Sequence, residues 1–231
     1  MITISKKENN LNSENIVVLI GGWGCKEYMY FLIKKKIPKN YGYIHYSYSD
    51  EMLNSDPEST RSNFLKFIQI MIKDLEVLNK NQNKKIYLYG QSLGGLFCMI
   101  ISTKITVNKI MLVTTGYNLA QDFWLGDGTR ALRDQMVLKT NITLPELKEV
   151  WKEISPDFYL EQKNKLNNPD YFIILSKNDK TIPTPSGIEV INYLERNTIN
   201  FRLLWVNYSH KITLVKEMIL LGNFKKWLEH N

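Results

Sequence analysis

The segment from Lys85 to Thr103 constrains the fold of this chain more strongly than any other. A short apolar run, Lys85 to Tyr89, leads into Gly90-Gln91-Ser92-Leu93-Gly94-Gly95, and a second apolar run extends from Leu93 to Thr103. The first run is typical of a buried strand and the second of a buried helix. The glycines on either side of the serine indicate a strained turn, in which side chains would strike the neighbouring strand and helix. The segment therefore predicts a strand that turns sharply into a helix.

Strand-like and helix-like segments alternate along most of the chain. The alternation predicts an α/β fold with a mostly parallel central sheet and helices on both of its faces. In such a sheet, functional residues lie just after the carboxyl ends of the strands. We expect strands over 15–21, 43–48, 85–89, 109–114, 171–175 and 200–206, and helices over 26–36, 59–79, 93–103, 186–194 and 213–228.

The length and composition favour one globular domain. The chain has 231 residues, of which 44% are hydrophobic, and this is enough to bury a core. Its start lacks the pattern of a secretory signal, and its apolar runs are far shorter than the roughly 20 residues that span a bilayer. We therefore expect a cytoplasmic protein without stable membrane insertion. In that compartment Cys25 and Cys98 should be free thiols.

The distribution of charge and of histidines argues against two other classes of function. The net charge is +7, but the lysines are spread along the chain, with local groups only at 34–36 and 84–85, and no aromatic-interleaved RNA motif accompanies them. We expect no nucleic-acid partner. The histidines at 45, 210 and 230 form no ligand cluster, so we expect no metal.

Ser92 is the candidate nucleophile, because the turn exposes its hydroxyl at a helix N-terminus. A serine needs an adjacent base, and His210 follows the last predicted strand, whereas His45 lies within a strand and His230 is next to the C-terminus. Such a base needs an acid to orient it. Asp179 follows the strand at 171–175, and Asp50, after the second strand, is its rival. At this point His210 could still be a surface histidine and Asp179 a turn former.

The order Ser, Asp, His along the chain, with each residue placed after a predicted strand, resembles the pattern of the α/β-hydrolase superfamily. The similarity covers nearly the whole chain from Asn15, and Asn178-Asp179-x-x-Ile182-Pro183 looks like the family's acid loop. Two features depart from the family pattern. Ser209-His210 replaces the commoner Gly-His, and only Met1 to Ser5 could supply one of the family's first antiparallel strands.

The resemblance implies a serine hydrolase that forms an acyl-enzyme on Ser92 without a cofactor. His210 would be the base and Asp179 the orienting acid. The oxyanion would be held by the backbone amides of Leu93 and of Trp23, which lies in the loop Gly21-Gly22-Trp23-Gly24-Cys25.

The resemblance also implies that residues 117–168 are a small helical cap, inserted within a single domain of residues 1–231. This segment has no strand signal and a helical stretch around 144–154. Trp124, Leu125, Phe158 and Tyr159 could line an acyl pocket there, or could pack the cap on the core.

A small carboxylic ester is the expected substrate. The Gly22-Trp23-Gly24 loop also looks like that of pimeloyl-carrier methyl ester esterases, which would make an acidic acyl carrier protein a candidate partner for a basic surface. Thioesterases and acyltransferases use the same three residues, and a binding protein could keep the fold without turnover. The sequence leaves these alternatives open.

Overall fold

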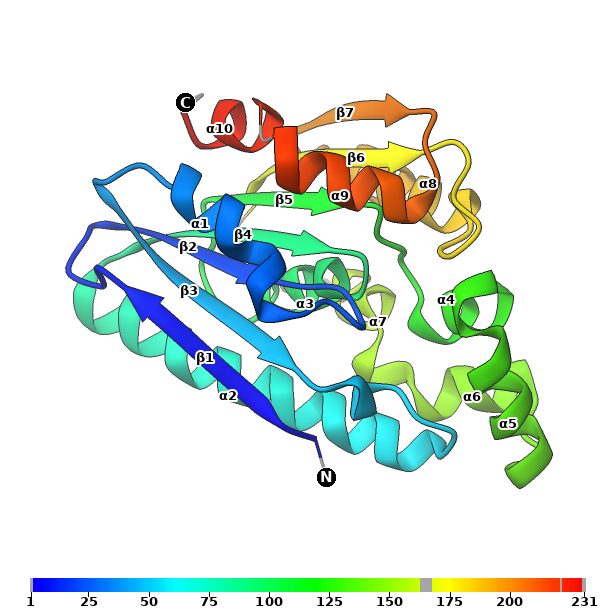
Figure 1. Cartoon of the computed structure of the whole chain (residues 1–231). Helices are drawn as coiled ribbons and strands as arrows, with labels where there is room; N and C mark the ends of the chain where they lie inside the picture. Colours follow the sequence, from blue (N-terminus) through cyan, green and yellow to red (C-terminus); the bar gives the residue numbers. More distant parts are fainter. Residues whose placement is uncertain (1, 163–167, 221, 230–231) are drawn as a thin grey trace.

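The computed structural model describes residues 2–162, 168–220 and 222–229, and Figure 1 shows their arrangement. Within these residues, seven strands form one sheet in the order β1-β3-β2-β4-β5-β6-β7. All neighbouring pairs are parallel except β1 and β3. The predicted mostly parallel α/β architecture is confirmed. The strands are β1 (Ile4–Asn9), β2 (Asn15–Ile20), β3 (Tyr41–Tyr48), β4 (Lys85–Gln91), β5 (Lys109–Val113), β6 (Asp170–Ser176) and β7 (Phe201–Val206).

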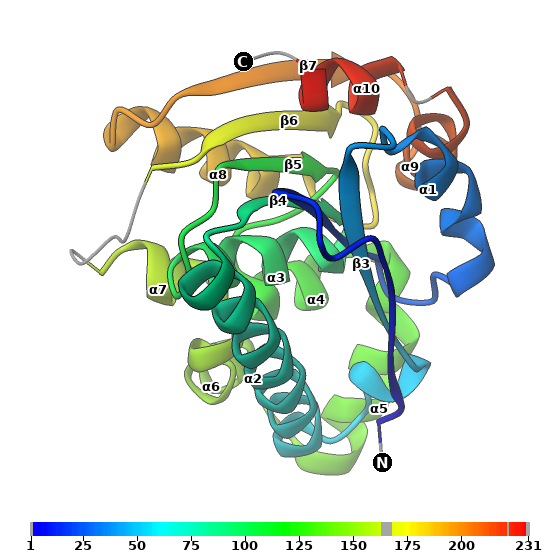
Figure 2. The ribbon, with the colours of Figure 1, turned by 90° about the vertical axis from the view of Figure 1, so that its left-hand side faces the viewer.

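Helices cover both faces of this sheet (Figure 2). One face carries α1 (Phe31–Lys36), α9 (His210–Leu220) and α10 (Gly222–Glu229), and the other carries α2 (Pro57–Gln82), α3 (Leu93–Ser102) and α8 (Thr184–Arg196). Successive residues of the central strands point to opposite faces. In β2, for example, Val17 and Leu19 pack with the α9 side, whereas Ile16 and Val18 pack with the α2 side. The two apolar cores explain why the strands read as continuous hydrophobic runs.

Between β5 and β6 the described residues form helices and no strand, as the sequence predicted. They are α4 (Leu119–Leu125), η3 (Asp127–Thr129), α5 (Arg130–Thr140), α6 (Leu144–Val150), η4 (Lys152–Ile154) and α7 (Pro156–Leu160). Helix α4 follows the carboxyl end of β5, and α7 packs against α3. Trp151 anchors this segment, because it is fully buried and its Nε1–H donates to the Pro57 carbonyl at 2.9 Å.

Two expected elements differ from those observed. The antiparallel strand runs over Ile4–Asn9 instead of ending at Ser5, and it pairs with β3 from Ile4 opposite Tyr48 to Asn9 opposite Tyr43. Most of its side chains are exposed, so its backbone hydrogen bonds hold it at the sheet edge and its hydrophobic pattern is too weak to reveal it. The single helix expected over 213–228 is two helices, the first of which begins at His210.

Two short 3-10 helices complete the described elements before β4. They are η1 (Glu27–Tyr30), which continues into α1, and η2 (Asp50–Met52), which precedes α2. The Asp56 carboxylate caps α2 by accepting from the Ser59 amide, and Asn83 ends the helix in a left-handed conformation at φ 48°. In the part of the chain that the structure describes, no helix is both long and apolar enough to cross a membrane.

Candidate active site

Ser92 occupies a strained turn between β4 and α3. Its backbone has φ 52° and ψ −122°, a conformation that residues other than glycine seldom adopt. The turn is held in place because the Ser92 amide donates to the Val113 carbonyl at 2.9 Å and the Ser92 carbonyl accepts from the Thr115 hydroxyl at 2.9 Å. Such strain persists only where the surroundings fix the backbone.

The two glycines of the turn are required by close backbone approaches. A Cβ atom at Gly90 would lie 2.6 Å from the Gly94 carbonyl oxygen, and one at Gly94 would lie 2.1 Å from the Ile20 carbonyl oxygen. Gly90 therefore lets α3 begin directly against β4, and Gly94 lets α3 pass against the end of β2. This is the collision with helix and strand that the sequence pattern predicted.

His210 lies at the first position of α9 with its ring between Ser92 and Asp179. Its Nε2 is 3.0 Å from Ser92 Oγ, and its Nδ1 is 2.6 Å from Asp179 Oδ2. A carboxylate can only accept, so the Nδ1–H donates to Asp179, which leaves Nε2 to accept from the serine hydroxyl. All three residues follow strands at the carboxyl edge of the sheet, where β4, β6 and β7 end.

The Asp179 carboxylate is fixed on its other side by its own loop. Its Oδ1 accepts from the amides of Thr181 and Ile182, both at 2.9 Å, and the side chain is buried. The rival acid, Asp50, instead forms an exposed ion pair with Lys26 at 3.0 Å. The structure thus brings Asp179 to His210 and leaves Asp50 elsewhere.

The loop after β2 passes directly against the serine. A Cβ atom at Gly22 would lie 3.0 Å from Ser92 Cβ and 3.2 Å from the Gln91 carbonyl oxygen, so a side chain here would push against the turn that holds the serine. Trp23, the next residue, is anchored by its Nε1–H, which donates to the Asp50 carbonyl at 2.7 Å. Leu93 begins α3 beside Ser92 and lines the same cavity as Trp23. The two amides expected to hold an oxyanion therefore belong to segments that meet at Ser92.

A cavity of about 470 Å³ opens beside Ser92 and His210. This volume is in the range of small-molecule sites. Its walls are mainly apolar and come from both sides of the turn: Leu53, Leu96, Leu119 and Phe123 on one side, and Met29, Leu214, Val215 and Met218 on the other.

Comparison with solved structures identifies the architecture. Acylaminoacyl peptidase from Pyrococcus horikoshii matches 100% of this chain, and 40% of its own, at 15% identity and a TM-score of 0.70. Esterase B from Lactobacillus Rhamnosis matches 94% of this chain and 79% of its own, at 11% identity and a TM-score of 0.57. The chain has the α/β-hydrolase fold.

The α/β-hydrolase fold alone does not fix the activity. The glycosylation-associated protein complex Gap123 from Streptococcus agalactiae also matches, over 96% of this chain and 43% of its own, at 12% identity and a TM-score of 0.67. This chain spans about two fifths of the length of that protein and of the peptidase. No protein-family model matches the sequence, and no curated protein matches it by sequence search.

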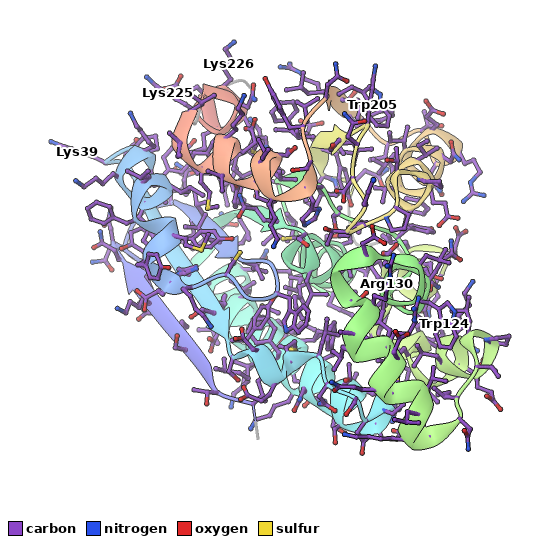
Figure 3. The ribbon with its side chains drawn as sticks, turned by 45° about the vertical axis from the view of Figure 1, so that its right-hand side comes forward. Lys39, Trp124, Arg130, Trp205, Lys225 and Lys226 are labelled. Carbon is purple, nitrogen blue, oxygen red and sulfur yellow. The ribbon has the colours of Figure 1, made fainter. Side chains whose placement is uncertain are left out.

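The four residues proposed from the sequence to line the pocket do not line the cavity beside Ser92. In α4 the side chains that face it are Leu119, Asp122 and Phe123. These are three and four residues apart and share one helix face, whereas Trp124 and Leu125 point to other faces, with Leu125 exposed. Phe158 lies beside a separate surface hollow, and the Tyr159 hydroxyl donates to the Glu153 carbonyl. Figure 3 shows Trp124 and Arg130 on the α4–α5 side of the molecule.

Asp122 is a cavity residue that sequence reasoning missed. It is buried, its carboxyl group lies against Gly116, and neither oxygen has a well-formed hydrogen bond. Burial raises the pKa of the Asp122 carboxyl well above its ordinary value, an effect that the Ser186 hydroxyl partly offsets. The signal that could have found it is its helical spacing from Leu119, which places both on the face toward Ser92.

The cysteines and the remaining histidines contribute little to this chemistry. Both thiols are free; Cys25 lines the cavity and Cys98 is buried in α3. Burial raises the pKa of each thiol, which disfavours the reactive thiolate.

His45, in β3, is buried against the ring of Tyr30, and desolvation lowers the pKa of His45 to about 4. His230 lies outside the described residues. Within residues 2–162, 168–220 and 222–229, no group of His, Cys, Asp and Glu side chains could hold a metal ion.

Proposed function

We propose that this chain is a serine hydrolase that cleaves a small carboxylic ester through an acyl-enzyme. The observation that carries the proposal is the continuous hydrogen-bond path from Ser92 Oγ through the His210 ring to Asp179 Oδ2, with contacts of 3.0 and 2.6 Å. It lies at the mouth of a mainly apolar cavity of about 470 Å³. A serine, a base and an orienting acid in this arrangement are the elements of nucleophilic acyl transfer.

In the acylation step, Ser92 Oγ attacks the ester carbonyl carbon as His210 Nε2 takes the hydroxyl proton. The carbonyl oxygen becomes an oxyanion, which the Leu93 and Trp23 amides stabilise. Collapse of this intermediate breaks the bond to the alcohol oxygen, and the imidazolium returns its proton to the departing alcohol. Asp179 holds the ring in the productive tautomer and stabilises its positive charge.

In the deacylation step, water takes the place of the alcohol. His210 Nε2 removes a proton from the water as its oxygen attacks the acyl carbon. Collapse of this second intermediate breaks the bond between the acyl carbon and Ser92 Oγ, and the imidazolium returns its proton to Ser92 Oγ as the carboxylic acid leaves. Neither reaction step requires a cofactor, because the base, the acid and the oxyanion donors all belong to the chain.

The test is hydrolysis of short p-nitrophenyl esters by the wild type and by Ser92→Ala. We expect the variant to lose turnover by a factor of at least about 10³ while its melting temperature stays the same. Ser62→Ala, an exposed serine on α2, is the matched control and should retain full activity. Equal rates for Ser92→Ala and the wild type would refute the proposal. A panel of esters, thioesters and amides of graded chain length then separates esterase from thioesterase and peptidase activity.

A further inference from the structure

Helix α9 is apolar on the side that faces away from the sheet as well as on the side that faces it. Leu214 and Met218 pack inward, whereas Ile212, Val215 and Ile219 form an outward stripe, with Ile219 57% exposed. A surface helix normally presents polar residues on its outward side. The stripe at positions i, i+3 and i+7 therefore indicates a second contact surface, beyond the one that packs α9 on the sheet.

The neighbouring segment η1–α1 shows the same feature. Tyr30 and Ile33 are buried against the sheet, but Tyr28 is 77% exposed, Phe31 55%, and Leu32 is also exposed. Helix α1 packs beside α9 on the same face of the sheet. We call these side chains together the α1–α9 apolar face: Tyr28, Phe31, Leu32, Ile212, Val215 and Ile219. Large exposed apolar residues gathered on neighbouring helices are uncommon on a monomer and indicate an interaction site.

Three exposed lysines on α1 and α9 flank this apolar face. Lys35 holds its ammonium 4.2 Å from the centre of the Phe31 ring, and Lys36 of α1 and Lys211 of α9 are exposed. Among the described residues, no carboxylate pairs with any of the three. The one acid of η1, Glu27, is already neutralised by Lys7 at 2.8 Å and Lys34 at 3.6 Å. Figure 3 shows Lys39, Lys225 and Lys226 projecting from the same side of the molecule, where α1 and α10 lie; of these, Lys225 pairs with Glu229 at 3.6 Å.

The α1–α9 apolar face is continuous with the mouth of the Ser92 cavity. Val215 belongs to both, and Met29 of η1 and Lys211 of α9 also line the cavity. A molecule held at this face therefore lies next to the cavity that contains Ser92.

We propose that the α1–α9 apolar face docks on an anionic lipid bilayer, with α1 and α9 lying in the headgroup region. Exposed aliphatic and aromatic side chains would enter the acyl boundary while flanking lysines meet lipid phosphates, as in interfacial amphipathic helices. The apolar residues project from two helix surfaces, which suits a fluid partner that moulds around them. The lysines make the face electrostatically complementary to that partner.

This docking deepens the proposed function, because it would bring lipid-dissolved acyl esters to Ser92. That consequence rests on the hydrolase activity, whereas docking itself does not. Binding measured with Ser92→Ala should equal that of the wild type, so a failure of catalysis and a failure of docking give different results.

The experiment is co-sedimentation of the full chain with vesicles of phosphatidylcholine alone and of phosphatidylcholine mixed with phosphatidylglycerol. We expect binding to the anionic vesicles only, weakened by added salt. Lys35→Ala should weaken it about fivefold, and the pair Phe31→Ser with Ile219→Ser at least about tenfold. Neither Phe31 nor Ile219 lines the cavity, so hydrolysis of a dissolved short ester should be unchanged in these variants.

Matched controls lie on distant helices. Leu138, 84% exposed on α5, is as apolar as Ile219, and Lys66 on α2 is as exposed as Lys35. Leu138→Ser and Lys66→Ala should bind vesicles like the wild type. Equal loss in these controls, or no binding to anionic vesicles at low salt, would overturn the proposal. It would also be overturned if the face instead bound a second copy or an acidic carrier protein, seen as self-association or complex formation that Ile219→Ser abolishes.

Discussion

Gly94→Ala tests whether the position of the nucleophile depends on one close backbone contact. The added Cβ atom would lie 2.1 Å from the Ile20 carbonyl oxygen and 2.7 Å from that of Gly21, whereas real Cβ atoms essentially never approach closer than 3.0 Å. Both obstacles are backbone atoms, so no side-chain rotation can relieve the overlap. Either the start of α3 or the end of β2 must move by roughly 1 Å, a displacement large enough to disturb catalysis.

That displacement separates the two segments that the proposed mechanism brings together. The start of α3 carries Ser92 and Leu93, and the end of β2 carries the loop with Trp23. A misplacement of about 1 Å costs on the order of 10²-fold in rate, and overpacking of this kind costs about 1–3 kcal/mol of unfolding free energy. We therefore expect Gly94→Ala to fold with reduced stability and to hydrolyse p-nitrophenyl esters about 100-fold more slowly.

Gly222→Ala is the matched control, since no atom lies within 4 Å of a Cβ built there. It should keep full activity and gain up to about 1 kcal/mol of stability. Urea titration and ester kinetics on the two variants measure both quantities. If Gly94→Ala were as active and as stable as the wild type, the steric account of the turn would be wrong.

Two further predictions concern the carboxylates of the site. Asp179→Asn should lower kcat by roughly 10⁴-fold because the amide favours the wrong tautomer of His210, whereas Asp50→Asn should change it little; the reverse result in ester kinetics would move the acid to Asp50. Asp122→Asn should raise the melting temperature at pH 7.5 and much less at pH 4. Burial raises the folded-state pKa of Asp122, so below the unfolded pKa both states are protonated, and folding loses about 1.4 kcal/mol per pH unit between the two pKa values. A gain that is the same at both pH values would exclude ionisation as its cause.

The sequence predicted the parts of the site that depend on local steric rules and on strand ends. The glycines around Ser92 identify a turn from chain geometry alone, and parallel strands bring their carboxyl ends to one edge. His210 and Asp179 could therefore be placed near Ser92 from their positions after β7 and β6, without knowledge of any contact. The choice between Asp179 and Asp50 was decided by a contact, the 2.6 Å approach to His210.

The cavity wall was less predictable because it depends on how the helical segment between β5 and β6 packs. Aromatic residues such as Trp124 and Phe158 were natural candidates by type, but the rotation of each helix decides which side chains face Ser92. Asp122 escaped notice because an acidic residue in an amphipathic helix is usually solvated. Strand β1 extends to Asn9 through exposed, charged residues, and a strand held at an edge by backbone hydrogen bonds leaves little trace in hydrophobic patterning.

Covalent labelling of the folded protein by a fluorophosphonate probe tests the central claim most directly. The probe reacts with a serine only when a base activates it and an oxyanion site accepts the phosphoryl oxygen. The account predicts one adduct per chain by intact mass, located by peptide mapping on Ser92 and lost in Ser92→Ala and His210→Ala. A folded wild-type chain that remains unlabelled, or that carries the adduct on another residue, would contradict it.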